Sequence, residues 1–403
     1  MTEPQQPDSA KYAATLVALY ALAERQLLAG ITRILQRTPA TLEGLQAAMP
    51  QIRRLARQVS ARLIYSSNPL AAKMITAAVD EGAKDALEAV GKALERVPAA
   101  HRPIIPGADI APTGGGTPPP PIGKALDASE DDFFDFSMPH GERSANAIRA
   151  DIESELADVR FRITRLPDDV YKFIAPHGGI YQALANGVTP AQAQAMAWRV
   201  FTASGVTGFT DKSGRDWALS SYVEMAVRTA ATRAYNASHL ARMHAMGVHY
   251  FSVPDDGHPC PLCFPWQHRV LTDGVIANPV MHVDGTIAQA TAAGLFHPNC
   301  KHVLIPVFAG VTVLGEPQTW TPEMNDAYQL TQKQRRLELE VRKAKRALEY
   351  AIDPEARKAA LADVRKAQKR VREFVAATGL NRQSRREQID LTDPRIKLPT
   401  PIR

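Results

Sequence analysis

The feature that most constrains this chain is the placement of its cysteines. Only three cysteines occur in 403 residues, and all of them lie between Cys260 and Cys300. An odd number confined to one short segment argues against a disulfide framework. Residues 254–310 also contain many turn residues and five of the eleven histidines. A loop-rich segment of this kind needs a cross-link to be stable, so we expect a bound metal to hold it together.

Two short motifs supply candidate ligands, Cys260-Pro-Leu-Cys263 and His297-Pro-Asn-Cys300. Each places two metal-binding side chains three residues apart, with a proline shaping the turn. Zn²⁺ prefers four nitrogen or sulfur ligands in a tetrahedron, so the sequence predicts a structural zinc site made of Cys260, Cys263, His297 and Cys300. His302 is the alternative fourth ligand, because it follows Cys300 by two residues. Buried thiols without a metal and a redox C-x-x-C are the other interpretations.

Four protein ligands leave no open position, so the predicted zinc stabilises the fold and does no Lewis-acid chemistry. The sequence contains no G-x-x-x-x-G-K-[ST], G-x-S-x-G or H-E-x-x-H motif, and we expect the protein not to be an enzyme. The enzyme alternative is a metal-dependent nuclease of the HNH type, for which His297, Asn299 and His302 offer the residue types. The residues after His302, VLIPVF, predict a strand, whereas such a site needs a helix there.

The composition predicts a mainly α-helical fold, because alanine is abundant and aromatic residues make up only 6%. Apolar residues at three- and four-residue steps predict helices over residues 9–37, 42–66 and 69–97, and Pro69 begins the third. We interpret residues 1–97 as an N-terminal helical bundle. Residues 98–124 contain eight prolines and five glycines, which predicts a linker.

Residues 125–253 are predicted to form a helical core that leads into the zinc module at 254–310. Its helices are expected over 145–166, from Pro167, after Thr189 and over 218–246, and residues 205–217 are expected to form a loop or hairpin. A short strand is predicted over 249–254.

Residues 311–403 are predicted to form a basic helical hairpin and tail. Asp353 is the expected N-cap of its second helix and Gly379 the end of that helix. The spacing of apolar residues predicts a coiled-coil seam that consists of Leu337, Val341, Ala344 and Leu348 on the first helix and Leu361, Val364, Val371 and Val375 on the second.

The positive charge is concentrated in that hairpin. The net charge is +6, but residues 322–403 alone contain 20 Lys or Arg against 12 Asp or Glu. Contacts with nucleic acid are therefore expected there, with Lys343, Arg346, Arg365 and Lys369 as candidates, and a DNA-binding module is the third functional hypothesis. Mixed Glu and Lys along the helices favour a solvated coiled coil instead. We expect no membrane contact, because no stretch reaches 18 consecutive apolar residues.

Several motifs in a fixed order resemble phage minor capsid protein 2, a family related to the Mu F-like head morphogenesis proteins. The likeness covers about residues 168–380 and rests on Gly214-Arg-Asp-Trp217, Cys260-x-x-Cys263, Pro265-Trp266-Gln267, His297-Pro-Asn-Cys300-Lys-His302 and Gln332-x-Gln334-Arg-Arg. Two departures stand out. His268 occupies a position where many relatives have glycine, and Cys300-Lys-His302 replaces the Cys-x-Cys of many Mu F-like proteins, which keeps His302 a candidate ligand.

The resemblance implies a minor structural protein of a tailed bacteriophage that takes part in head morphogenesis. It implies a protein made in the cytoplasm of the bacterial host and placed in the capsid interior near the portal vertex. The implied partner is the portal protein, with the major capsid protein and the packaged DNA as further partners.

Overall fold

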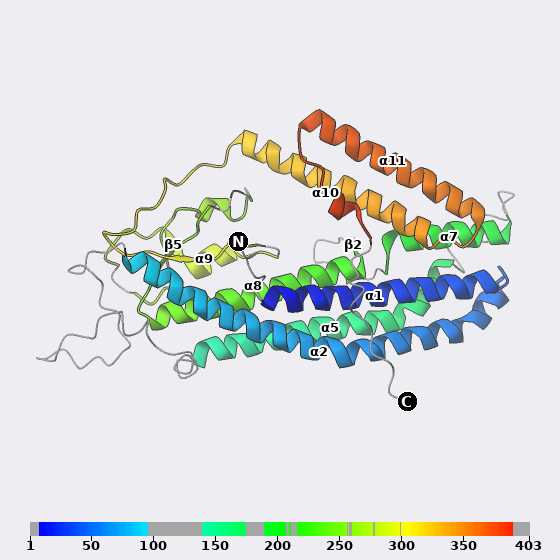
Figure 1. The fold of residues 1–403 in the computed structure, drawn as a ribbon, viewed down its shortest axis with the longest axis horizontal. Helices are drawn as coiled ribbons and strands as arrows, with labels where there is room; N and C mark the ends of the chain where they lie inside the picture. The colour runs from blue at the N-terminus through cyan, green and yellow to red at the C-terminus, as the bar shows by residue number, and fades with distance from the viewer. Residues whose placement is uncertain are drawn as a thin grey trace, which may run out of the picture. The chain divides into compact units, whose positions relative to one another are not determined.

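A computed structural model shows a mainly helical protein with two small sheets, which confirms the predicted fold class (Figure 1). The predicted linker, residues 98–124, lies outside the residues that the structure describes. The described residues are 8–95, 139–174, 189–206, 209–210, 216–255, 257, 260–276, 279–298 and 300–389.

Two long helices replace the three that the sequence predicted for the N-terminal region. Helix α1 spans Asp8–Arg37, and α2 spans Leu42–Glu95 without a break at Pro69. The predicted separation at Pro69 is therefore wrong. A proline inside a helix removes one backbone hydrogen bond and costs about 3 kcal/mol. The residues just before it are held by tertiary contacts, because the Arg160 guanidinium donates to Ser67 Oγ at 3.1 Å and to Asn68 Oδ1 at 3.2 Å.

Helix α5, Pro139–Ile174, likewise continues through Pro167, where a new helix was predicted. Leu166 and Val170 lie one turn apart on either side of this proline and are both buried. The same face of the helix is thus packed before and after Pro167, and this burial offsets the lost hydrogen bond.

The predictions for the next segment are confirmed. Helix α7, Pro190–Ser204, starts at a capping box in which the Thr189 and Gln192 side chains bond to each other's backbone N–H. Strands β1, Phe209–Thr210, and β2, Asp216–Trp217, pair as an antiparallel hairpin. Helix α8, Leu219–Ala245, is followed by Gly247, whose φ of 78° ends the helix in the left-handed conformation.

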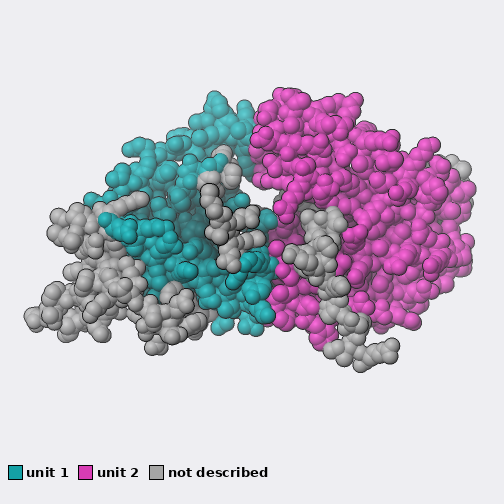
Figure 2. Space-filling view, viewed as in Figure 1, with its two compact units in different colours: residues 1–13, 71–152, 228–328 teal, residues 14–70, 153–227, 329–403 magenta. Residues whose placement is uncertain are grey.

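The chain folds into two compact units, each assembled from segments distant in the sequence (Figure 2). The consecutive domain boundaries expected from the sequence stay predictions. Unit 1 consists of Met1–Ala13, Ala71–Ile152 and Arg228–Tyr328, and unit 2 of Ala14–Leu70, Glu153–Val227 and Gln329–Arg403.

Unit 1 contains a four-stranded sheet in the order β5-β4-β3-β6. Only the β4–β5 pair is parallel among these pairings. The short helix α9, Ile287–Ala292, follows β5 directly and begins with a capping box at Thr286. The strands span Tyr250–Ser252 (β3), Leu271–Thr272 (β4), Gly285–Thr286 (β5) and Ile305–Pro306 (β6).

Unit 2 joins parts of the N-terminal helices to later helices through buried polar contacts. The Glu24 carboxylate is 6% exposed and accepts from the backbone N–H of Val206 at 2.9 Å and of Ser220 at 3.2 Å. The indole of Trp198 is fully buried and donates to the Tyr350 carbonyl at 3.0 Å. Helix α1 is long and apolar enough to cross a membrane by length and composition alone, but most of that apolar stretch is buried within the protein.

The predicted C-terminal hairpin is present as α10, Pro322–Glu349, and α11, Pro354–Thr378, which lie side by side (Figure 1). Asp353 caps α11 by accepting from Ala356 N at 2.7 Å, and Gly379 ends it with a φ of 70°. The predicted position of Leu361 in the seam is wrong, because its side chain is 39% exposed. The neighbouring Ala360 is fully buried instead, so the buried stripe of α11 starts one residue earlier.

Candidate metal centre

Two tight turns in unit 1 present the predicted ligands. In the first, the backbone N–H groups of Cys263 and Phe264 both donate to the Cys260 carbonyl, at 3.1 and 2.9 Å. A short 3₁₀ helix, Phe264–Trp266, continues from this turn. In the second, Cys300 N donates to the His297 carbonyl at 2.8 Å. Each turn therefore fixes the direction of two candidate ligands three residues apart.

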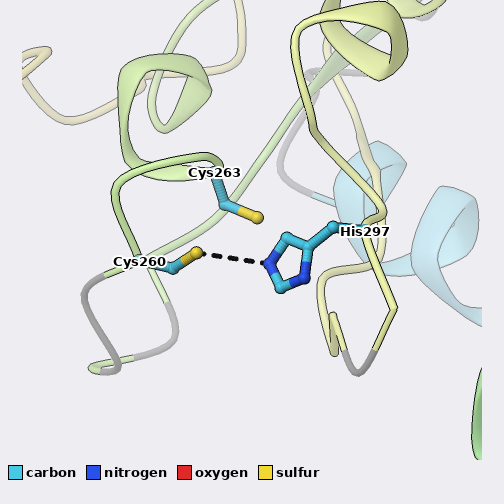
Figure 3. Close-up of side chains that lie close together, drawn as sticks. All are labelled: Cys260, Cys263 and His297. Carbon is cyan, nitrogen blue, oxygen red and sulfur yellow. Dashed lines mark hydrogen bonds between the residues drawn. The ribbon is translucent and has the colours of Figure 1, made fainter. Parts of the chain in front are cut away.

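The structure brings all five candidate ligands together. Cys260 Sγ lies 3.2 Å from His297 Nε2, and the Cys263 thiol points toward the same imidazole (Figure 3). Cys263 Sγ lies 3.7 Å from Cys300 Sγ, and Cys300 Sγ lies 3.4 Å from His302 Nδ1. The ligand atoms of Cys260, Cys263 and His297 lie within 4.8 Å of one another, as do those of Cys263, Cys300 and His302. Cys263 is common to both groups and lies at the middle of the cluster.

The electrostatics of the cluster suit a cation. Hydrogen bonding from Cys263, and then from His297, lowers the pKa of Cys260 to about 3. Hydrogen bonding from Cys263 and then from His302 lowers the pKa of Cys300 to about 4. The pKa of Cys263 is raised, because its thiol bonds to Cys260 and Cys300 and is buried. The hydrogen bonds of the cluster thus favour the thiolate form of Cys260 and Cys300, which is the form that binds zinc.

The ring of His297 is oriented as in a metal ligand. Its Nδ1 lies 2.8 Å from the Pro298 carbonyl oxygen. A carbonyl oxygen only accepts, so Nδ1 carries a proton, and Nε2, which faces Cys260, is the nitrogen that would bind a metal once its own proton leaves. Hydrogen bonding to Cys260 raises the pKa of His297 to about 9, so a metal bound at Nε2 would displace a proton. A ligating histidine whose other nitrogen is fixed by a carbonyl is the usual arrangement in metal sites.

His302 faces its cysteine with Nδ1, whereas His297 faces its cysteine with Nε2. His302 is 4% exposed, and its Nε2 lies 3.2 Å from the amide nitrogen of Gln267. With the amide nitrogen as donor, Nε2 is the acceptor and the ring proton lies on Nδ1, which then donates to Cys300 Sγ. Because the nitrogen that faces Cys300 keeps the proton of the neutral ring, His302 is suited to support a ligating thiolate and not to bind the metal itself. Gln267 belongs to the Pro265-Trp266-Gln267 motif, but its spacing in the sequence does not predict the contact with His302.

The cluster is part of the apolar core of unit 1. Cys263 and Cys300 are 1% and 7% exposed and pack in the same buried group as Val90, Phe251 and Leu304. Helix α2, strand β3 and the segment after Cys300 thus contribute to the same core as the thiols. A substitution in the cluster will therefore also alter the packing of the core of unit 1.

The sequence model of one protein family, described as phage minor capsid protein 2, matches residues 145–376. The match covers more than half of the chain. The chain belongs to the phage minor capsid protein 2 family. It is thus a structural protein of the phage virion, where it interacts with other virion components. No curated protein and no solved structure matches it.

The turn after Gln267 contains a residue with an unusual backbone conformation. His268 has a φ of 60°. This left-handed conformation is unstrained for glycine but costs energy for a residue with a Cβ atom. The turn after Gln267 thus keeps a backbone shape suited to glycine even though histidine occupies it.

The predicted nucleic-acid contacts of this family member differ in exposure. Arg365 is exposed, and Lys343 and Lys369 are solvent-accessible but lie near Glu340 and Glu373, at 3.4 and 3.5 Å. Arg346 is only 7% exposed, and its guanidinium donates to the Ala203 carbonyl at 3.2 Å. Such burial is at odds with a place on a surface that faces DNA. Sequence spacing placed Arg346 on a helix but could not show which face packs against α7.

Proposed function

We propose that the protein is a head-assembly component that binds the portal from the capsid interior, with a structural zinc ion in its Cys/His centre. The observation that carries this proposal is the continuity of the family match, which runs from α5 through the core, the metal centre and most of the hairpin. These parts are inherited as one piece, which is expected if they act together in assembly.

The ligands of the proposed zinc are Cys260, Cys263, His297 and Cys300. His297 Nε2 faces Cys260, and hydrogen bonds within the cluster lower the pKa of Cys260 and of Cys300. Bound there, the ion would supply folding free energy to a segment whose strands are only two or three residues long. His302 and Gln267 would orient Cys300 from outside the ligand set.

The portal proposal is tested by co-expressing the full-length chain with the portal protein of the same phage and isolating the complex by a tag on the portal. Truncations are unsuitable, because each compact unit combines distant segments. We expect wild-type protein to co-purify in a fixed ratio and Cys263→Ser to co-purify much less. A chain that never co-purifies, although folded and zinc-loaded, would overturn portal binding.

The basic hairpin is proposed to make a secondary contact with packaged DNA. Replacing Lys343, Arg365 and Lys369 by Gln removes three accessible charges. Each lost phosphate contact lowers the slope of log K against log salt by about 0.9. We expect weaker DNA association with a smaller salt dependence and unchanged portal co-purification, measured by gel shift from 50 to 200 mM salt.

We propose that the centre is not a nuclease. Residues Ile305–Pro306 form strand β6 shortly after His302, where an HNH-type site would need a helix, and the strand prediction is thus confirmed. Plasmid DNA incubated with the purified protein and Mg²⁺ or Mn²⁺ is expected to stay intact. Cleavage that Cys263→Ser and His297→Ala both abolish would favour the nuclease instead.

A further inference from the structure

A second group of metal-binding side chains lies in unit 1, outside the Cys/His centre. It consists of His244, His249 and Asp273, whose ligand atoms all lie within 4.8 Å of one another. Asp273 Oδ2 lies 2.6 Å from His249 Nδ1 and 3.5 Å from His244 Nε2. No sequence pattern predicts this group, because its members are five and 24 residues apart and follow no ligand motif.

Three separate elements position these side chains. His244 is in the last turn of α8, His249 directly precedes β3, and Asp273 directly follows β4. Strands β3 and β4 are paired through Tyr250 and Thr272, the immediate neighbours of two of these residues. The backbone spacing between His249 and Asp273 is therefore fixed by the sheet, which is what a preorganised site requires.

The Asp273 carboxylate is oriented toward both imidazoles. Its Oδ1 accepts from the backbone N–H of Val275 at 3.0 Å, which leaves Oδ2 facing the two rings. The two rings are edge-to-face, with centroids 4.9 Å apart and an interplanar angle of 78°. The side chain of Asp273 is 11% exposed and that of His244 is 38% exposed, so the group is walled by protein on one side and open to solvent on the other.

We infer that His244 Nε2, His249 Nδ1 and Asp273 Oδ2 form a second, open metal site for a divalent first-row transition ion of the Zn²⁺ class. Two imidazoles and one carboxylate are ligands that such ions accept, and three protein ligands leave room for water. The cation would also lie near the C-terminal end of α8, where the helix dipole favours positive charge. A single His–Asp ion pair would account for His249, but not for a second imidazole directed at the same oxygen.

Zn²⁺ itself is the probe, added by calorimetric titration to full-length protein whose cysteine centre is already loaded. We expect one further ion to bind per chain, and His244→Ala and Asp273→Asn to weaken that step at least about 10-fold. His244→Ala is the cleaner variant, since this side chain is the most exposed of the three. His282→Ala is the matched control, because His282 is an exposed histidine that lies 3.6 Å from another carboxylate, Asp284, and its loss should leave the second step unchanged.

Co²⁺ distinguishes the two sites by spectroscopy. Thiolate ligands give Co²⁺ an intense sulfur-to-metal charge-transfer absorption, which a site of two imidazoles and a carboxylate lacks. We expect His244→Ala to keep this absorption, because the thiols are untouched, while it loses the further binding step of the sulfur-free site. If loaded wild-type protein takes up no further ion, or if His244→Ala and Asp273→Asn bind it as wild type does, the group is only an ion pair and the inference is wrong.

Discussion

The predicted zinc module, residues 254–310, and the C-terminal hairpin differ in how much regular secondary structure they contain. The module has strands of two or three residues and a six-residue helix, and its turns converge on five Cys and His side chains. The hairpin consists of helices of 28 and 25 residues with a cap, a terminating glycine and a continuous buried seam. With the proposed zinc bound, the stability of the module depends on a few ligand atoms, whereas that of the hairpin is spread over many contacts. A single substitution should therefore have a far larger effect in the module.

The largest expected effect comes from Cys263→Ser. This residue belongs to both ligand groups and to the apolar core, and structural zinc binding contributes on the order of 10 kcal/mol of apparent free energy. We expect this variant to lose the zinc and to be cleaved rapidly within residues 254–310. Limited proteolysis with mass spectrometry of the fragments measures this.

Amide hydrogen exchange of the hairpin is the internal control for this variant. Residues 337–371 should keep their protection, because their seam does not involve the thiols. Full zinc occupancy with an unchanged cleavage pattern in Cys263→Ser would mean that this residue is not a ligand.

The two histidines should differ in the next largest effect. His297→Ala removes a proposed ligand whose Nε2 faces Cys260, whereas His302→Ala removes a residue that bonds to Cys300 and to Gln267. Mutation of a residue that supports a metal ligand typically lowers the metal affinity 10–100-fold, and loss of a ligand should lower it further. Competition with a chromophoric chelator measures both affinities. The reverse ranking would make His302 the fourth ligand.

Packing in the hairpin gives an effect of intermediate size. Leu337 is 8% exposed in the seam, and Leu337→Ala should lower the free energy of unfolding by about 2–4 kcal/mol. Leu361→Ala is the control: this leucine is 39% exposed and should cost well under half as much. Denaturant unfolding followed by circular dichroism measures both. Equal losses would contradict the shifted register of α11.

The same contrast explains what the sequence could predict. Asp353, Gly379 and the helices of the hairpin follow from local rules of capping and periodicity, and these predictions are confirmed. The spacing of the Cys and His motifs likewise predicted which side chains would gather. Local rules failed at Pro69 and Pro167, where tertiary packing keeps the helices continuous.

Other features depended on contacts between segments distant in sequence. Arg346 was placed among the accessible charges because its helical face could not be read without α7. His244 and Asp273 come together only because β3 and β4 pair beside the end of α8. Sequence spacing contains no record of such pairings, so neither the burial nor the cluster could have been predicted.

The smallest expected effect is a gain in the module. His268 has a φ of 60°, a conformation that glycine adopts without strain, so we expect His268→Gly to stabilise the turn. Removing that strain should raise the free energy of unfolding of the zinc-loaded protein by about 0.5–1 kcal/mol, offset in part by the freer unfolded chain. Thermal unfolding compares the variant with wild type. A clear loss of stability would show that the imidazole itself is needed in this turn.

X-ray absorption at the zinc edge shows whether the module is held by a zinc ion with three sulfur ligands and one nitrogen ligand. Asp273→Asn protein purified with one zinc per chain is the sample, so that the inferred second site does not contribute. We expect three Zn–S distances of about 2.3 Å and one Zn–N distance of about 2.0–2.1 Å. Protein that is folded without zinc, or a zinc coordinated only by nitrogen and oxygen, would contradict the proposed zinc site.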